Sequence, residues 1–162
     1  MKRLDNKVAI VTGASKGIGA GIANAFGAEG AAVVINYTRD HEGAERVVRE
    51  IAGKGGRAIA VQGDVAQRSE AQRLVAEAKK AFGRLDVLVN NAGVFSFAPF
   101  EQFSEQEFHR QFNTNVLGMR WVDRWMPNLI HYNILDRGGH FAAWEQPALH
   151  AKEIRDCFAK VR

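Results

Sequence analysis

The sequence predicts an α/β protein built on a single, doubly wound parallel sheet of five strands in the order 3-2-1-4-5. Two observations lead to this prediction. Apolar runs with strand character alternate with helical patterns along the chain, and the apolar runs are continuous rather than alternating with polar residues. Continuous apolar strands are typical of parallel sheets, because helices cover both faces of such a sheet.

The strands are expected at residues 8–11, 31–37, 57–61, 85–89 and 129–135. Apolar residues at helical spacing predict helices over 18–26, 44–51, 71–82, 108–119 and 154–161. Glycines follow the first three helical patterns, as is common at helix ends. Strands joined through helices form right-handed crossovers, and ligands of such sheets bind beyond the carboxyl ends of the strands.

Length and composition favour one globular domain over residues 1–162, with 46% hydrophobic and 25% charged residues. The net charge of +4 is spread without a basic block, so we expect no nucleic-acid partner. No apolar run suits a signal peptide or a membrane span, so we expect no membrane association and a cytoplasmic location. Cys157 is the single cysteine, and we expect no metal site.

A glycine-rich turn, TGASKGIG at residues 12–19, separates the first strand from the first helix. Gly13 allows a tight turn, Gly17 allows backbone N–H groups to approach an anion, and Gly19 allows close packing of the helix. The positive end of the helix dipole then faces a phosphate group. The turn therefore predicts a phosphate site, with a purely structural connection as the alternative.

Asn115 falls on the apolar stripe that Phe108, Phe112 and Val116 define at helical spacing. A buried carboxamide needs hydrogen-bond partners. We therefore expect this side chain either to tether neighbouring backbone or to serve a site.

Four motifs follow one another within residues 4–118. They are TGASKGIG at 12–19, Asp64-Val65, NNAG at 90–93, and Asn115 in NTNVLG. Together they resemble the short-chain dehydrogenase/reductase family, in which they are the cofactor motif, the adenine-side pair, the sheet-stabilising motif and the catalytic asparagine. The resemblance implies a Rossmann-type fold, close in size to a flavodoxin-like domain, and a nicotinamide dinucleotide as cofactor.

The charges near the end of the second strand favour NADP over NAD. A carboxylate there would bind a free ribose 2′-hydroxyl and repel a 2′-phosphate. Residues 36–39 (NYTR) contain no acid before Asp40, whereas Lys16 and Arg39 are cations that can pair with phosphate. The alternative is that both cations are solvated surface charges.

The residues expected to bind this dinucleotide combine the motifs with the charge argument. They are Gly13, Ser15, Lys16, Gly17, Ile18, Gly19, Arg39, Asp64, Val65, Asn91, Ala92 and Gly93.

The family's catalytic serine, and its tyrosine with a lysine four residues later, have no match in this chain. Tyr37 and Tyr132 are the two tyrosines, and position 136 is Asp. Reduction of a carbonyl needs a proton donor beside the nicotinamide. Asn115 therefore lacks the partners of that machinery, and we expect binding without a complete catalytic site.

Composition changes near residue 119, after which all three tryptophans fall. Residues 121–162 resemble the C-terminal βα unit of an α/β-hydrolase of the epoxide hydrolase type, which implies His140 as a catalytic histidine. We therefore interpret the chain as a chimera, most simply an engineered one, with a junction near residues 119–121. The segments that bury the nicotinamide in the reductase family, and those by which its members associate, have no match, so weak NADP(H) affinity and a monomer are expected.

Three other functions stay open. The protein is a scaffold that binds no ligand, a weak NADPH-dependent reductase with His140 as the acid, or a weak esterase. The esterase interpretation rests on Ser15, because residues 13–17 also fit the G-x-S-x-G pattern of a hydrolase nucleophile.

Overall fold

The computed structural model describes residues 2–97 and 99–118. The expected fifth strand, the last helix, the junction near residues 119–121 and His140 lie outside these residues.

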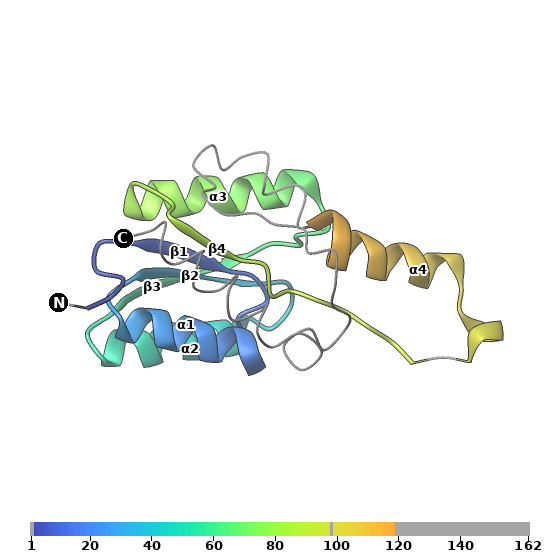
Figure 1. Cartoon of the computed structure of the whole chain (residues 1–162), viewed down its shortest axis with the longest axis horizontal. Helices are drawn as coiled ribbons and strands as arrows, with labels where there is room; N and C mark the ends of the chain where they lie inside the picture. The colour runs from blue at the N-terminus through green and yellow to red at the C-terminus, as the bar shows by residue number, and fades with distance from the viewer. Residues whose placement is uncertain (1, 98, 119–162) are drawn as a thin grey trace, which may run out of the picture. The chain divides into compact units, whose positions relative to one another are not determined.

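Four parallel strands form the sheet: β1 (Val8–Val11), β2 (Ala32–Tyr37), β3 (Arg57–Gln62) and β4 (Val87–Val89). Their order is β3-β2-β1-β4, which confirms the predicted order for these strands (Figure 1). In register, Val8 pairs with Ala32 and Ala32 with Arg57. The carboxyl ends of β1, β2 and β3 therefore meet at one edge of the sheet.

Helices cover both faces of the sheet, as a doubly wound fold requires. They are α1 (Gly17–Ala28), α2 (His41–Gly53) and α3 (Arg68–Phe82). Figure 1 shows α1 and α2 on one side of the sheet and α3 on the other. A 3-10 turn (Phe100–Gln102) and α4 (Glu105–Phe112) follow, and α4 continues as a π-helical turn over Asn113–Leu117.

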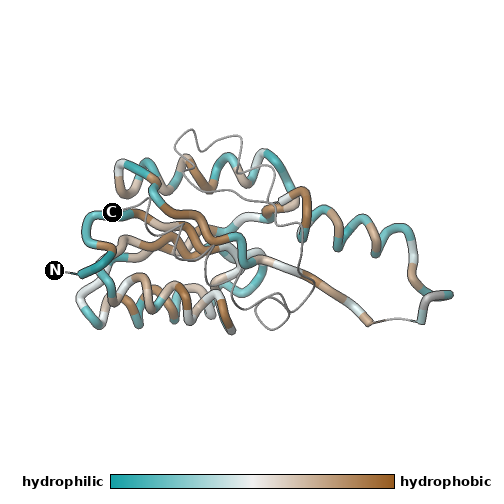
Figure 2. The backbone as a smooth tube through the Cα atoms, viewed as in Figure 1, coloured by the Kyte–Doolittle hydropathy of each residue, from teal (hydrophilic) through white to brown (hydrophobic). Residues whose placement is uncertain are grey.

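The core lies between β1, β2 and the helices. Every residue of β1 and β2 is buried, which explains why both strands are apolar on both faces. Val33 and Ile35 pack in one cluster with Ala23 of α1 and with Val47 and Ile51 of α2. Figure 2 shows these strands mainly in brown, whereas the helices beside them mix teal, white and brown.

The buried face of α1 differs in part from the predicted one, since Ile22 and Phe26 are half-buried against the core as their spacing predicts. The pattern starting at Ile18 predicts that residue in the core, but Ile18 is 79% exposed. The buried residues are Gly19, Ala23 and Gly27. A Cβ at Gly27 would lie 2.7 Å from Cγ2 of Ile51, so α1 packs through small residues that leave room for its neighbour. Apolar spacing alone does not reveal such a contact.

The predicted apolar stripe of α4 is also exposed. Phe108 is 51% exposed, Phe112 40% and Val116 42%. The predicted helix is confirmed for residues 108–112 and begins earlier, at Glu105, but none of the residues of α4 is buried among the described residues. Spacing identifies an apolar face without identifying what covers it.

Within residues 2–97 and 99–118, no helix combines the length and the apolar character needed to cross a bilayer.

Candidate functional site

The turn after β1 has a backbone that suits glycine. Gly13 has a φ of +62° and Gly17 a φ of +59°. A Cβ at Gly13 would lie 2.9 Å from Cα of Ala92, so the turn after β1 and the turn after β4 are in contact. At Gly17, by contrast, a Cβ would meet no described atom within 4 Å. One side of the turn is therefore packed, and the other is open to a ligand.

The Thr12 hydroxyl joins the turns after β1 and β4. It donates to the carbonyl of Val89 (3.1 Å) and accepts from the backbone N–H groups of Asn91 (2.9 Å) and Ala92 (3.0 Å). The Asn91 carboxamide donates in return to the carbonyls of Thr12 (2.8 Å) and Gly13 (3.2 Å). The two motifs that the sequence identified separately thus form one hydrogen-bonded unit.

Asn36, which is 1% exposed at the end of β2, links the turns after β1 and β3. Its Oδ1 accepts from the backbone N–H of Gly13 (3.2 Å), and its Nδ2 donates to the carbonyls of Gly63 (2.9 Å) and Val61 (3.3 Å). The Asn36 carbonyl also accepts from the N–H of Ala14 (2.8 Å). Because β2 lies between β1 and β3, the single carboxamide of Asn36 can hydrogen-bond both the turn after β1 and the turn after β3.

The N-terminus of α1 opens at this edge. Its N-cap residue, Lys16, has an extended backbone and, within the described residues, gives no side-chain hydrogen bond to the first turn. The first N–H groups of a helix have no intrahelical acceptors, and the helix dipole makes this end positive. The residues at 17–19 therefore present backbone donors and positive potential, which suits an anion.

Ser15 and the start of α2 hold the other side of the turn. Ser15 is 7% exposed, and Nη2 of Arg46 donates to its carbonyl (3.4 Å). Asp40 caps α2 by accepting from the N–H of Gly43 (3.0 Å). This bond, the Ser15 hydroxyl, and then the charges of Lys16 and Arg46 lower the pKa of the Asp40 carboxyl. Arg39 lies exposed just before it.

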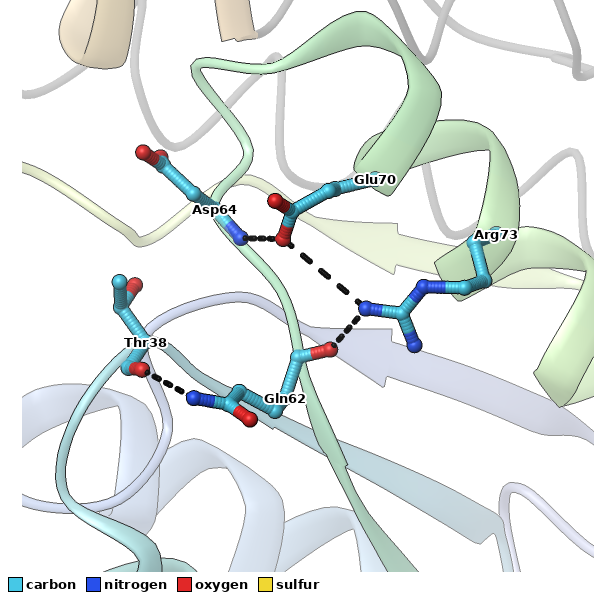
Figure 3. A pocket seen from close by; sticks show the side chains of 5 residues that line it. All are labelled: Thr38, Gln62, Asp64, Glu70 and Arg73. Atoms are coloured by element: carbon cyan, nitrogen blue, oxygen red, sulfur yellow. Dashed lines mark hydrogen bonds and ion pairs between the residues drawn. The ribbon is translucent and has the colours of Figure 1, made fainter.

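An open pocket of about 420 Å³ lies beside the ends of β2 and β3 (Figure 3). Its lining residues are all polar: Thr38, Gln62, Asp64, Glu70 and Arg73. Asp64 begins the turn after β3, and its carboxylate accepts from the N–H of Ala66 (2.9 Å).

Side chains of α3 fix the wall of this pocket. Oε2 of Glu70 accepts from the backbone N–H of Asp64 (2.7 Å). Arg73 donates to the Gln62 carbonyl (2.7 Å) and pairs with Glu70 at 3.9 Å, as Figure 3 shows. The turn that carries Asp64 is thus held by a charged side chain from the helix that follows it.

Asn115 lies in the π-helical turn and bonds the segment after β4. Its Oδ1 accepts from the N–H of Val94 (2.9 Å) and its Nδ2 donates to the Val94 carbonyl (2.8 Å). The predicted tether to backbone is therefore present, although Asn115 is exposed rather than buried.

A second tether joins the same segment to α4. The Ser96 hydroxyl donates to Glu107 (2.5 Å), which also accepts from Arg110 and Gln111. These hydrogen bonds, above all the one from Arg110, lower the pKa of Glu107 to about 2.

The structure brings most of the predicted site residues to one edge. The glycine turn contacts Asn91 and Ala92, and Asp64 lies at the neighbouring strand end. Val65 is buried, and its carbonyl lies near Gly118. The described residues contain no group of three or more His, Cys, Asp or Glu side chains able to hold a metal ion.

The sequence interpretation missed several residues that shape the site: Thr12 as a bridge, Asn36, Asp40, Arg46 and Glu70. A polar residue at the end of an otherwise apolar strand was the available signal for Asn36. The other four residues contact partners that become their neighbours only when the chain folds.

A parallel sheet in the order β3-β2-β1-β4, with a glycine turn between β1 and α1, defines the Rossmann class of α/β proteins. The sequence profile described as short chain dehydrogenase matches residues 7–133. The chain belongs to the short chain dehydrogenase family.

Relatives extend this result. An uncharacterized oxidoreductase of Methylorubrum extorquens is 56% identical over 119 residues, which are 74% of this chain and 48% of that protein. A short-chain dehydrogenase/reductase of Pestalotiopsis microspora is 42% identical over 149 residues, 92% of this chain and 54% of that protein. The chain spans about half the length of the curated relatives it matches.

The fold also matches a solved relative. The crystal structure of a short chain dehydrogenase from Burkholderia cenocepacia in complex with NADP gives a TM-score of 0.73 at 40% identity. The match covers 75% of this chain and 50% of that one.

The expected junction and hydrolase segment find no support. The family match continues to residue 133, and a 149-residue alignment within 162 residues passes through 119–121. The interpretation as a chimera is therefore withdrawn, together with the α/β-hydrolase resemblance of residues 121–162. It rested on the change of composition near residue 119 and on the sequence motif around His140, and the family match runs past that change of composition to residue 133.

Proposed function

We propose that this chain binds a nicotinamide dinucleotide, NADP(H) in preference to NAD(H), at the carboxyl ends of β1, β2 and β3. One observation carries the proposal. The glycine turn is fixed on its packed side by Asn36, Thr12 and Asn91, while its other side leaves the N-terminus of α1 open. A site ordered before binding loses less entropy when the ligand arrives.

Each part of the dinucleotide has a chemically suitable place. The diphosphate would lie at the N-terminus of α1, where backbone donors and the helix dipole favour an anion. The adenine would lie against Asp64 and Val65, beside the pocket of Figure 3. Lys16 and Arg39 are exposed cations available to a 2′-phosphate. The Burkholderia cenocepacia relative holds NADP in its crystal structure, which supports this assignment.

The proposal also concerns the proton donor that catalysis would need. The cofactor carries the hydride, and the protein has to place a proton donor beside the substrate carbonyl. No tyrosine of this chain is followed four residues later by lysine, and Asn115 is engaged with Val94. We therefore propose that the chain holds the cofactor without turning it over.

Titration of the full chain with NADPH and with NADH tests the proposal. We expect NADPH to bind about 5-fold more tightly, because two cations acting on a phosphate contribute on the order of 1 kcal/mol. Lys16→Ala/Arg39→Ala should remove most of this preference. The control Lys79→Ala/Lys80→Ala removes two charges from the last turn of α3 and should keep it.

Equal binding of NADPH and NADH in every variant would contradict the assignment of the cations. A melting temperature unchanged by millimolar NADPH would contradict binding itself and favour a scaffold without a ligand. Neither the reductase nor the esterase alternative gains an observation: His140 lies outside the described residues, and Ser15 is buried.

A further inference from the structure

We infer that Gly118 is a positioning residue for the nicotinamide half of the dinucleotide. It lets the π-helical turn of residues 113–117 lie against the carbonyl of Val65, and that π-helical turn holds the segment after β4 through Asn115. The inference rests on the proposed function and goes beyond it, because it assigns a role to a residue outside the predicted cofactor-binding set.

Space, and not backbone conformation, favours glycine at position 118. The φ of −53° and ψ of −40° are helical, and the N–H of Gly118 donates to the carbonyl of Asn113. Alanine is more stable than glycine in a helical conformation. A Cβ at Gly118, however, would lie 3.2 Å from the carbonyl oxygen of Val65 and 3.5 Å from its Cγ2. Glycine therefore allows a closer approach to the turn after β3 than alanine would.

The turn after β3 is the firmer side of this contact. Val65 is 7% exposed, and the N–H of the preceding Asp64 donates to Glu70 (2.7 Å). The Asp64 carboxylate also accepts from the N–H of Ala66 (2.9 Å). No residue of α4 is buried among the described residues, and Figure 1 shows the orange end of this helix beside the turn that leads from β3 into α3. An added Cβ should therefore displace the π-helical turn rather than the turn after β3.

The π-helical turn positions the segment after β4. Oδ1 of Asn115 accepts from the N–H of Val94 (2.9 Å), and its Nδ2 donates to the carbonyl of the same residue (2.8 Å). Both backbone polar groups of Val94 are thus held by one side chain of the turn. Single π-helical turns are rare and often lie at functional sites. A shift of this turn should move Val94 with it.

The strand order places Val94 at the nicotinamide end of the site. The proposed function assigns the adenine to the ends of β2 and β3 and the diphosphate to the N-terminus of α1, which follows β1. In the order β3-β2-β1-β4, the dinucleotide then continues toward the end of β4, shortly before Val94. Gly118 should therefore affect a ligand that reaches past β1, and spare a ligand that ends there.

Two ligands separate these cases. NADPH spans the whole site, whereas adenosine 2′,5′-bisphosphate carries the adenine half alone. We expect the full chain with Gly118→Ala to bind NADPH on the order of 5-fold more weakly, and its affinity for adenosine 2′,5′-bisphosphate to change less than about 2-fold. Gly21→Ala is the matched control, because it adds the same methyl group to a glycine of α1 with no described atom within 4 Å. It should change neither affinity.

A double-mutant cycle tests whether Gly118 acts through Asn115. Asn115→Ser shortens the side chain that bonds Val94, so it should give the same selective loss of NADPH affinity. In this background Gly118→Ala should add less than about 2-fold to the loss, because the link is already broken. Asn115→Ser also keeps the link testable if Gly118→Ala does not fold.

The outcomes separate this inference from the proposed function. If Gly118→Ala weakens both ligands alike, Gly118 acts on the adenine side and the inference is overturned. It is overturned too if neither ligand is affected, if Gly21→Ala gives the same loss, or if the losses of Gly118→Ala and Asn115→Ser add in full. If wild-type protein binds neither ligand, the proposed function fails first, and the inference fails with it.

Discussion

Hydrogen bonds from side chains hold two regions of the molecule, but in different surroundings. One region is the edge of the sheet at the ends of β1, β2 and β3, and the other is the segment that runs from β4 into α4. At the sheet edge the bonding groups are buried: Thr12 and Asn36 are each 1% exposed. In the segment after β4, Asn115 bonds the backbone of Val94 at an exposed position, and the half-buried Glu107 bonds the Ser96 side chain.

The comparison shows that equal hydrogen-bond geometry does not mean equal stability. A buried donor that loses its partner has no water to replace it, whereas an exposed one is solvated at once. The sheet edge should therefore be rigid and costly to disturb, and the α4 segment should depend on weaker tethers. A preordered edge suits binding of a cofactor, so the contrast supports placing the dinucleotide there.

The largest expected difference in stability between the two regions comes from replacing Asn36 or Asn115 by leucine, an apolar side chain of similar size. Asn36→Leu leaves the part-buried Gly13 N–H and the buried Gly63 carbonyl without partners, and should lower the free energy of unfolding by about 3 kcal/mol. Asn115→Leu breaks two bonds to Val94 at an exposed position and should cost less than about 1 kcal/mol. Urea unfolding followed by circular dichroism measures both. Equal costs would break the comparison.

Removing the Thr12 hydroxyl should have a smaller effect of the same kind. Thr12→Val keeps the shape of the side chain but leaves the N–H groups of Asn91 and Ala92 without their acceptor. We expect a loss of about 1–2 kcal/mol in the free energy of unfolding. Thr38→Val, at an exposed position, is the matched control and should change it by less than about 0.5 kcal/mol. A neutral Thr12→Val would mean that the two turns are independent.

Much of this architecture followed from the sequence. Continuous apolar runs placed four strands to within about two residues, because burial on both faces selects such residues. The glycine turn was also identified, because its positive φ angles restrict the residue type. The bridging role of Asn36 was not predicted, since its partners Gly13 and Gly63 lie 23 and 27 residues away. The exposure of the apolar face of α4 was not predicted, because the spacing of apolar residues does not show whether another part of the chain packs on them.

Glu70 offers a sharper test of the adenine side. Glu70→Ala frees the Asp64 N–H, so the cofactor would have to order the turn after β3, and NADPH affinity should fall about 5-fold. Glu77→Ala removes the same charge from the same helix and should leave affinity unchanged. Reduced nicotinamide mononucleotide, which lacks the adenosine, should bind both variants alike. If Glu70→Ala also lost affinity for this fragment, Glu70 would not act through the adenine side.

The smallest expected effect concerns the α4 segment and depends on pH. Folding lowers the pKa of Glu107 from 4.5 to about 2, so its bonds stabilise the protein above pH 4.5 and this contribution is lost as the pH falls toward 2. Because Glu107 is solvated, Glu107→Gln should lower the melting temperature at pH 7 by no more than about 2 °C. The difference from wild type should narrow between pH 4.5 and 2. A difference in melting temperature that stays constant with pH would contradict the assigned role.

The central claim is that the dinucleotide binds at the rigid edge and not at the α4 segment. Amide chemical shifts of the full chain, recorded while NADPH is added, test this most directly. The account predicts the largest shifts at residues 13–19, 38–40 and 63–66, with small changes over 105–112. Shifts confined to residues 105–112, or none with NADPH in large excess, would contradict it.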